Sequence, residues 1–249
     1  MAVLATDGGS SYYHWMVDVL PRIHLLKEAG LFDKIETFVL PPMNSDFQRE
    51  TLHLLKLPAE KMIFADSRDF AVTADHVFVP SLPSRLGVIE AWTCMYLQEA
   101  FSEWRAQDGA SPRKIYISRD DAPIRRVTAA AQFKARLLEA GYTEILCSEH
   151  SVEEQIKLFA NATHVVAPHG GGLTNILFCE PGTKVLDIFP SSFVIPCYWS
   201  LSNRVGLRYH CYSDGPVENA FSPYWVNEDR NISIDDRFWP LFYEFDKSG

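Results

Sequence analysis

An apolar run at residues 165–167 leads through Pro168 and His169 into three consecutive glycines, Gly170, Gly171 and Gly172. The run predicts a buried β-strand, and the glycines predict a turn that opens an amphipathic helix. Because glycine has no Cβ, a ligand can approach the backbone of this turn closely. The N–H groups and the positive dipole end of the helix favour a phosphate or carboxylate there, and His169 adds a donor. The alternative is an ordinary strand-to-helix turn, for which one glycine would be enough.

Strand and helix patterns alternate along almost all of the 249 residues, which predicts an α/β protein with parallel sheets and right-handed crossovers. In the first half, strands are expected at 3–6, 35–40, 62–65 and 76–79, and helices at 12–28, 46–55 and 88–105. In the second half, strands are expected at 114–118, 143–147, 164–167, 184–189 and 207–212. Helices are expected there at 128–140, from 151, from the glycine loop to 178, and near 198–205 and 236–245.

The small, polar segment at 106–112 is the best candidate for a linker, since Gly and Pro interrupt it. It divides the chain into an N-terminal domain of residues 1–106 and a C-terminal domain of residues 113–249. We therefore expect two Rossmann-like, parallel-sheet domains that face each other across a cleft.

The net charge of −9 argues against a nucleic-acid partner and against broad binding to anionic membranes, so that membrane association would be peripheral at most. Residues 113–136 reverse this balance, with seven basic and two acidic side chains, a local charge of +5. A confined positive patch suits a small anionic ligand. The five cysteines are scattered without metal-ligand spacing, and the start of the chain has no secretory signal pattern, so a reducing cytoplasm is the expected location.

Arginines follow the first expected strand of the second half. Arg119 comes at the carboxyl end of that strand, where α/β proteins place ligand groups. Arg125 and Arg126 follow in the next loop, and a guanidinium can bind phosphate oxygens with two parallel hydrogen bonds. The alternative is salt bridging to Asp120 and Asp121. The spacing does not decide which of Arg125 and Arg126 would contact a phosphate.

The first expected helix carries a polar row on an otherwise apolar surface. His14, Asp18 and Arg22 are four residues apart and therefore share one face. A histidine held by a carboxylate can act as a general base on a hydroxyl, although the row could equally be the wet face of the helix. No pair of acids flanked by apolar strands suggests a site for Mg²⁺ or Mn²⁺, so we expect no metal and no cofactor.

Taken together and in this order, the motifs resemble the glycosyltransferase family 61 domain, known from capsular-polysaccharide proteins. The resemblance covers most of residues 11–190 and rests on four segments: Tyr13-His14-Trp15 with Asp18 and Pro21-Arg22, Tyr116-Ile117-Ser118-Arg119 with Arg125-Arg126, Glu154-Gln155-Ile156, and Pro168 to Asn175. It implies a GT-B fold and inverting transfer without an obligatory metal, with a nucleotide-diphosphate-sugar as donor and a glycan or polysaccharide hydroxyl as acceptor.

The resemblance also implies roles for single residues. Arg119 with Arg125 or Arg126 would meet the diphosphate, and His14 or Asp18 would face the acceptor. The donor loop would consist of His169, Gly170, Gly171, Gly172, Leu173 and Asn175. One departure is Ala129-Ala130, where members of the family commonly have Asn-Glu at the start of a helix. Two other functions stay open, a binding module without catalysis and a nucleotide-sugar epimerase or hydrolase.

Overall fold

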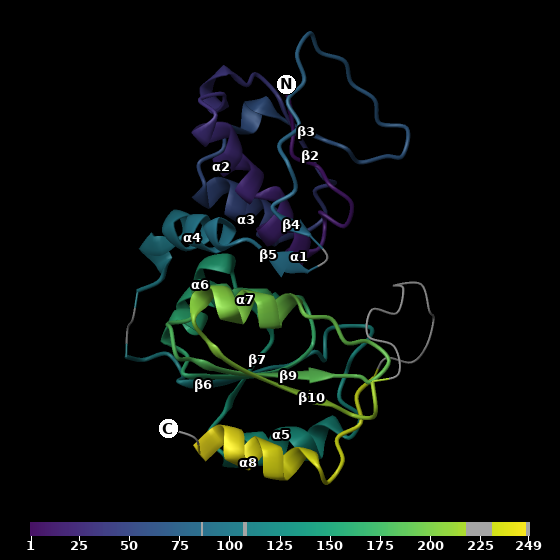
Figure 1. Cartoon of the computed structure of the whole chain (residues 1–249), viewed down its shortest axis with the longest axis vertical. Helices are drawn as coiled ribbons and strands as arrows, with labels where there is room; N and C mark the ends of the chain where they lie inside the picture. The colour runs from purple at the N-terminus through teal and green to yellow at the C-terminus, as the bar shows by residue number, and fades with distance from the viewer. Residues whose placement is uncertain (86, 107–108, 218–230, 248–249) are drawn as a thin grey trace. The chain divides into compact units, whose positions relative to one another are not determined.

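The computed structural model describes residues 1–85, 87–106, 109–217 and 231–247. They form two compact units, Met1–Glu103 and Trp104–Gly249, each with a parallel sheet (Figure 1). The prediction of an α/β protein with parallel sheets is therefore confirmed. Residues 107 and 108 of the expected linker lie outside the described residues.

The second unit holds a five-stranded parallel sheet in the order β10-β9-β8-β6-β7. Its strands are β6 (Lys114–Ile117), β7 (Thr143–Ile145), β8 (His164–Pro168), β9 (Lys184–Phe189) and β10 (Arg208–Ser213). Counted within the unit, this is the order 2-1-3-4-5. Sheets of this order change winding direction between the first and third strands, here β6 and β8. Ligands in open parallel sheets bind at the carboxyl ends of the strands at such a switch point.

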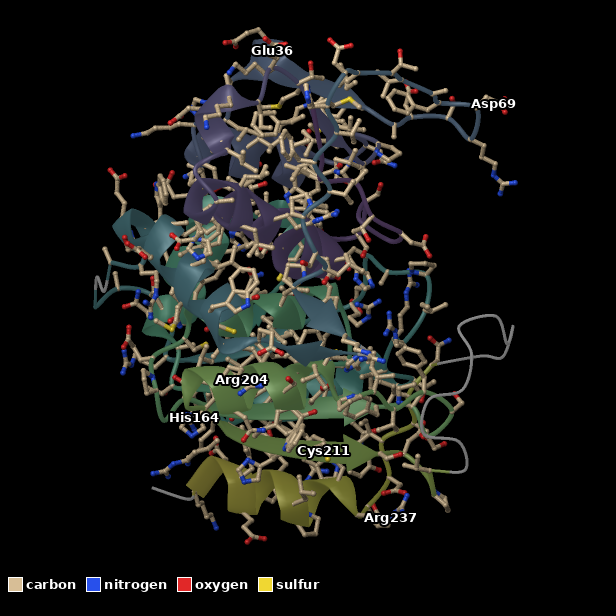
Figure 2. All side chains as sticks on the ribbon, turned by 45° about the horizontal axis from the view of Figure 1, so that its top comes forward. Glu36, Asp69, His164, Arg204, Cys211 and Arg237 are labelled. Atoms are coloured by element: carbon tan, nitrogen blue, oxygen red, sulfur yellow. The ribbon has the colours of Figure 1, made fainter. Side chains whose placement is uncertain are left out.

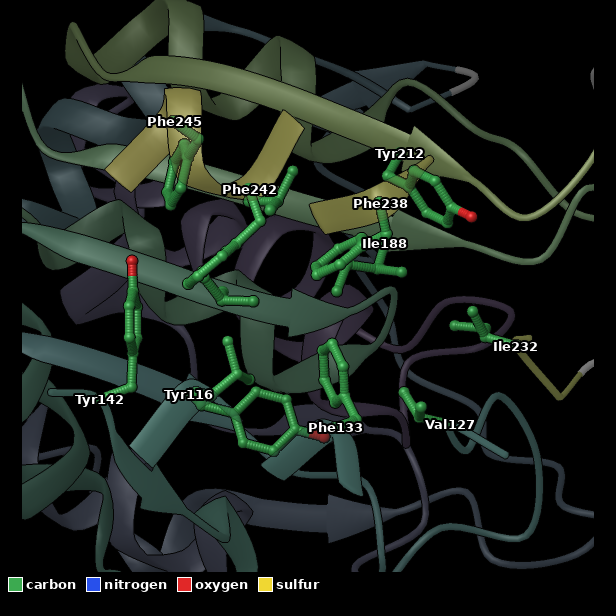
Figure 3. Packing of buried hydrophobic residues seen from close by; sticks show 13 residues of the cluster. Tyr116, Val127, Phe133, Tyr142, Ile188, Tyr212, Ile232, Phe238, Phe242 and Phe245 are labelled. Carbon is green, nitrogen blue, oxygen red and sulfur yellow. The ribbon is translucent and has the colours of Figure 1, made fainter. Parts of the chain in front are cut away.

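Helices cover both faces of this sheet (Figure 1). One face carries α5 (Ala130–Glu139) and α8 (Phe238–Lys247), and the other carries α6 (Val152–Asn161) and α7 (Cys197–Val205). Figure 3 shows aromatic rings of α8, among them Phe238 and Phe242, packed toward Ile188 of β9 and Phe133 of α5. Burial of such large rings contributes strongly to stability, so this layer anchors the sheet that carries the switch point.

The amino ends of four adjacent strands carry a row of basic residues. The register pairs Lys114 with His164, His164 with Lys184, and Lys184 with Arg208. Lys114 Nζ donates to Ala140 O at the end of α5, at 3.3 Å, and Lys184 Nζ donates to a carbonyl in the last turn of α8, at 3.2 Å. Cations at helix C-termini complement the helix dipole, so the row fixes the ends of both helices to this edge. Figure 2 labels His164 at this edge.

The segment after the glycine loop differs from the expected amphipathic α-helix. It is a 3-10 helix, η6 (Gly171–Phe178), and its residues from Leu173 to Phe178 are all buried. A segment buried on every side has no polar face, and three-residue turns suit the tight space between β8 and the following strand. The prediction of an amphipathic helix was therefore wrong, because η6 has no polar face.

The first unit holds the three-stranded parallel sheet β1-β2-β3 and a separate two-stranded hairpin, β4-β5. Its strands are β1 (Ala2–Val3), β2 (Phe38–Leu40), β3 (Met62–Phe64), β4 (Ser84–Arg85) and β5 (Val88–Ile89). Its helices are α1 (Tyr12–His14), α2 (Pro21–Glu28), α3 (Asp46–Leu54) and α4 (Ala91–Ala100). Short 3-10 turns complete the described chain: η2 (Phe32–Lys34), η3 (Ala59–Lys61), η4 (Ser102–Trp104) and η5 (Cys147–Glu149).

Three predictions for the first unit need correction. The expected helix at 88–105 is shorter, because residues 88–89 pair in the hairpin and the last turn is 3-10. The expected strand at 76–79 is reduced to a single bridge between Phe78 and Ala2. The expected helix at 12–28 contains a π-helical turn, η1 (Trp15–Val19), in which Leu20 N bonds Trp15 O, five residues back. Pro21 supplies the reason, since its ring and missing N–H disturb the regular hydrogen-bond ladder.

Candidate functional site

The switch point of the second unit brings two predicted site residues into contact. Arg119 follows β6 and Gly170 follows β8, and these strands are neighbours in the sheet. The guanidinium of Arg119 lies directly against the α-carbon of Gly170, where a Cβ would be 1.8 Å from Nη1. Gly170 has an extended backbone, with φ of 177°. Glycine is therefore required at this position for the close approach of Arg119 and not for an unusual dihedral angle.

The charge of Arg119 is poorly compensated by its surroundings. Burial, followed by repulsion from Arg125, lowers the pKa of Arg119 to about 10, against opposing contributions from groups that include Asp121. Its Nε and Nη2 donate to the carbonyl of Ile124, at 3.3 and 3.2 Å. A guanidinium held by a neutral carbonyl beside a second cation is stabilised by an added anion.

The structure separates Arg125 from Arg126. Arg125 is half-buried, has a positive φ of 60°, and places its guanidinium 5.1 Å from the ring centre of Phe193. Arg126 is exposed, and its Nε donates to the carbonyl of Ala122. Of the two, Arg125 is the one whose charge contributes to the lowered pKa of Arg119.

The other glycines and the loop carbonyl are held by neighbouring side chains. Tyr198 of α7 donates its hydroxyl to Gly170 O at 2.7 Å. At Gly172, a Cβ would stand 3.0 Å from Ile117 Cγ2 and 3.1 Å from Cys147 Sγ. Gly171 and Gly172 are half-buried and begin η6. The backbone of the loop is thus fixed in place on both sides of Gly170.

His169 lies beneath the loop in the interior of the unit. Its side chain is 2% exposed, and its Nδ1 lies 3.0 Å from Asp187 Oδ2. Tyr209 donates to the same carboxylate oxygen at 2.9 Å, and the ring of Phe189 stacks on the imidazole with centres 4.5 Å apart. The His169 ring is therefore buried and is not a surface donor, and its contacts are those of a support for the loop.

Leu173 and Asn175 are also enclosed. Leu173 is 1% exposed, and Asn175 is fully buried with its Nδ2 donating to Gln155 Oε1 at 2.8 Å. Gln155 Nε2 in turn donates to the carbonyls of Cys147 and His150, both at 2.9 Å. This network connects η6 to the turn after β7. Leu173 and Asn175 therefore support the loop from the interior of the unit.

The first unit brings together His14 and Asp18. Their Nδ1 and Oδ2 atoms are 2.6 Å apart, across the start of the π-helical turn. The histidine side chain is 35% exposed, whereas that of Asp18 is 7% exposed. Gly8 packs on the ring, where a Cβ would stand 2.9 Å from His14 Cδ2. A half-exposed imidazole whose Nδ1 faces a buried carboxylate can act as a general base.

Arg22, the third member of the predicted row, has a different partner set. It is buried and donates from Nη1 to the carbonyls of Leu4 and Ala5, at 2.9 and 3.1 Å, and from Nε to Pro80 O at 2.9 Å. These bonds hold three backbone segments together. The row is thus divided into a His14–Asp18 pair and a structural arginine.

The sequence patterns did not indicate two residues of the candidate site, Ser84 and Tyr198. Ser84 lies 66 positions after Asp18 in the sequence, and it donates to Asp18 Oδ1 at 2.5 Å. Tyr198 reaches the carbonyl of Gly170 from 28 positions away. A lone serine or tyrosine carries no periodicity that would reveal such a contact. Asp187, in contrast, lies within the apolar run of residues 185–189 in β9, and this pattern could have indicated a buried polar partner.

In the part of the chain that the structure describes, no group of three or more His, Cys, Asp or Glu side chains is arranged to hold a metal ion. Among the same residues, no helix is both long enough and apolar enough to span a bilayer. All five cysteines are free thiols.

A parallel α/β unit with clustered arginines and a glycine loop at its switch point is an arrangement on which α/β proteins bind the phosphates of nucleotides. Comparison with known families gives a match to the family model Glycosyltransferase 61 over residues 12–186. The chain belongs to this family, as its resemblance predicted.

Two curated relatives match over shorter stretches. A beta-1,2-xylosyltransferase, RCN11, from Oryza sativa subsp. japonica is 34% identical over 65 residues, and a beta-1,2-xylosyltransferase from Arabidopsis thaliana is 29% identical over 65 residues. Each match covers 26% of this chain and 12% of the relative. The chain therefore matches only about an eighth of the length of these relatives.

Proposed function

We propose that the protein transfers a sugar from a nucleotide-diphosphate-sugar to a hydroxyl group of a glycan or polysaccharide, with inversion and without a metal. The observation that carries this proposal is the contact of the Arg119 guanidinium with Gly170 at the switch point. Family membership supports transfer of a glycosyl group as the reaction.

In the proposed reaction, the oxygen of the acceptor hydroxyl attacks the anomeric carbon while the bond from that carbon to the diphosphate oxygen breaks. The electron pair of the broken bond stays on the diphosphate, which gains negative charge as it leaves. Arg119 and Arg125 stabilise this charge, together with backbone N–H groups of the loop. Preorganised donors of this kind contribute about 3–4 kcal/mol each in a transition state. Because two guanidiniums supply the positive charge, the proposal assigns no role to a metal ion.

The proton of the acceptor hydroxyl passes to His14 in this scheme. Its Nδ1 faces Asp18 at 2.6 Å, so Nε2 is the nitrogen available to accept a proton. Asp18 stays ionised and stabilises the imidazolium, which is why we assign the base to His14 and not to Asp18. A GT-B arrangement, in which the two units face each other across a cleft, is part of the proposal, as is a cytoplasmic location.

The names of the two plant relatives suggest xylose as the first donor sugar to test, and the acceptor is proposed only as a glycan. The test begins with binding. Isothermal calorimetry with pyrophosphate, nucleoside diphosphates and their sugars is expected to show binding to the protein and at least a tenfold weaker affinity in Arg119→Ala. The control is Arg113→Ala, an exposed arginine just before β6, at the opposite end of the strand.

Turnover of the donor that binds best then distinguishes sugar transfer from the alternative functions. Sugar transfer that requires an added acceptor supports the proposal. Donor breakdown or epimerisation without an acceptor would assign the protein to the hydrolases or epimerases. Binding without turnover over a broad acceptor panel would identify a binding module. Absence of any nucleotide binding would contradict the donor site itself.

A further inference from the structure

We propose that Ser84 is a positioning residue for the general base, as the first member of a hydrogen-bonded chain Ser84–Asp18–His14. Ser84 Oγ donates to Asp18 Oδ1 at 2.5 Å, and Asp18 Oδ2 lies 2.6 Å from His14 Nδ1. Each oxygen of the carboxylate therefore has its own partner. The inference rests on the proposed function, because it assigns the role of base to His14.

The fold holds Ser84 in this place from two directions. Ser84 begins β4, and it pairs with Ile89 of β5, whose side chain is fully buried. The segment that leads to β4 is fastened at Pro80, whose carbonyl accepts hydrogen bonds from Arg22. Arg22 lies one helical turn beyond Asp18, so the same helix that carries the carboxylate also fixes the approach of the serine.

The chain of contacts selects one state of the imidazole. An ionised Asp18 accepts hydrogen bonds only, so the Nδ1 that faces it carries the proton and Nε2 carries the lone pair. The Ser84 hydroxyl prevents Asp18 from rotating toward another partner. In the reaction, the acceptor proton moves to Nε2, while the protons on Nδ1 and on Ser84 stay where they are. Ser84 thus acts through Asp18 and does not touch the substrate.

Loss of the serine hydroxyl removes one of the two partners of the Asp18 carboxylate. In Ser84→Ala, the carboxylate is free to turn away from His14 Nδ1 and no longer holds the imidazole in one tautomer. A smaller share of the protein then presents the Nε2 lone pair to the acceptor hydroxyl, which makes His14 a poorer base. Arg22, whose charge interacts with Asp18, stays in place.

The test compares Ser84→Ala with Ser84→Thr, which keeps the hydroxyl, and with Ser81→Ala, an exposed serine in the same approach segment. In Ser84→Ala, kcat is expected to fall by about tenfold while KM changes little. Ser84→Thr is expected to restore the wild-type kcat, and Ser81→Ala is expected to leave it unaltered. Ser84→Cys, with a weak donor, is expected to give an intermediate loss of kcat and serves if the alanine variant is poorly folded.

A second readout needs no substrate. The ¹⁵N chemical shifts of the His14 ring, assigned by comparison with His14→Gln, report which nitrogen carries the proton. The wild type is expected to show the Nδ1–H form, and Ser84→Ala is expected to show a mixture of both forms. Unchanged ring shifts and an unchanged kcat in Ser84→Ala would overturn the role of Ser84. Full transfer activity in His14→Ala would instead overturn the proposed base, so the two failures are distinguishable.

Discussion

The Arg119 guanidinium occupies the space that the Cβ of any other residue would need at position 170, with Nη1 1.8 Å from the ideal Cβ position. The two residues come from the ends of neighbouring parallel strands, β6 and β8. In the proposed function, the cation and the loop backbone are therefore parts of one anion site, so that a change at either residue alters the other.

Gly170→Ala is expected to displace the guanidinium of Arg119 while the sheet stays folded. A hydrogen bond to a charged group contributes about 1.5–3 kcal/mol, so the affinity for pyrophosphate is expected to fall by roughly 10–100-fold. Calorimetry with pyrophosphate measures this directly, and circular dichroism checks the fold.

The matched control is Gly182→Ala. Gly182 has a φ of 88° and no atom within 4 Å of its ideal Cβ position, so alanine there introduces backbone strain without a clash. This variant is expected to lose stability and to keep its affinity for pyrophosphate. An equal loss of affinity in both variants would contradict the assignment of Gly170.

His164 predicts an acid-sensitive contribution to stability. Burial, together with Lys184 and Lys114, lowers the pKa of His164 to about 4, against an ordinary value near 6.5. The unfolded state therefore binds more protons between pH 6.5 and pH 4, and stability is lost as pH falls through this range. His164→Gln is expected to show a smaller decrease in Tm between pH 7.5 and pH 4.5 than the wild type.

His53→Gln, which replaces an exposed histidine in α3, provides the comparison. It is expected to follow the wild-type decrease in Tm. If His164→Gln lost as much Tm as His53→Gln over the same pH range, the buried-histidine explanation would be wrong.

The backbone conformation of Ala129 predicts that a substitution at this position stabilises the protein. It stands at the N-cap of α5 with φ of 54° and ψ of 37°, a left-handed conformation that alanine adopts at a cost of about 1–2 kcal/mol. Asparagine tolerates this conformation and can also cap the helix, so Ala129→Asn is expected to stabilise the protein by about 1 kcal/mol. Ala129→Gly should act in the same direction through the backbone alone.

Urea unfolding followed by circular dichroism measures both substitutions at position 129. Ala135→Gly, at an exposed position inside α5, is the opposite control and is expected to destabilise by about 1 kcal/mol. A destabilised Ala129→Gly variant would show that the left-handed conformation carries no strain.

The contact of Arg119 with Gly170 was predictable in outline because parallel strands bring their carboxyl ends to one edge. The strand pattern alone therefore placed the arginine loop and the glycine loop near each other. The support beneath them was not predictable, since Tyr198 and Asp187 act through single long-range hydrogen bonds. His169 was expected at the ligand surface, but a carboxylate on the neighbouring strand and a stacked Phe189 hold it in the interior.

The first unit shows a similar limit. The four-residue spacing predicted that His14 and Asp18 share a helix face, and their contact follows from it. The π-helical turn between them has a cause in the sequence, Pro21, but proline alone does not decide between a kink and a π turn. Ser84 could not be predicted, because a hairpin 66 residues away brings it to Asp18.

The most direct test of the account is the rate of sugar transfer by Arg119→Ala, measured with saturating acceptor and the donor that binds best. The account predicts that kcat/KM falls by about 100-fold or more, because a preorganised charge is removed from the leaving diphosphate, while Arg113→Ala keeps the wild-type rate. An Arg119→Ala protein that transfers sugar at the wild-type rate would contradict the account.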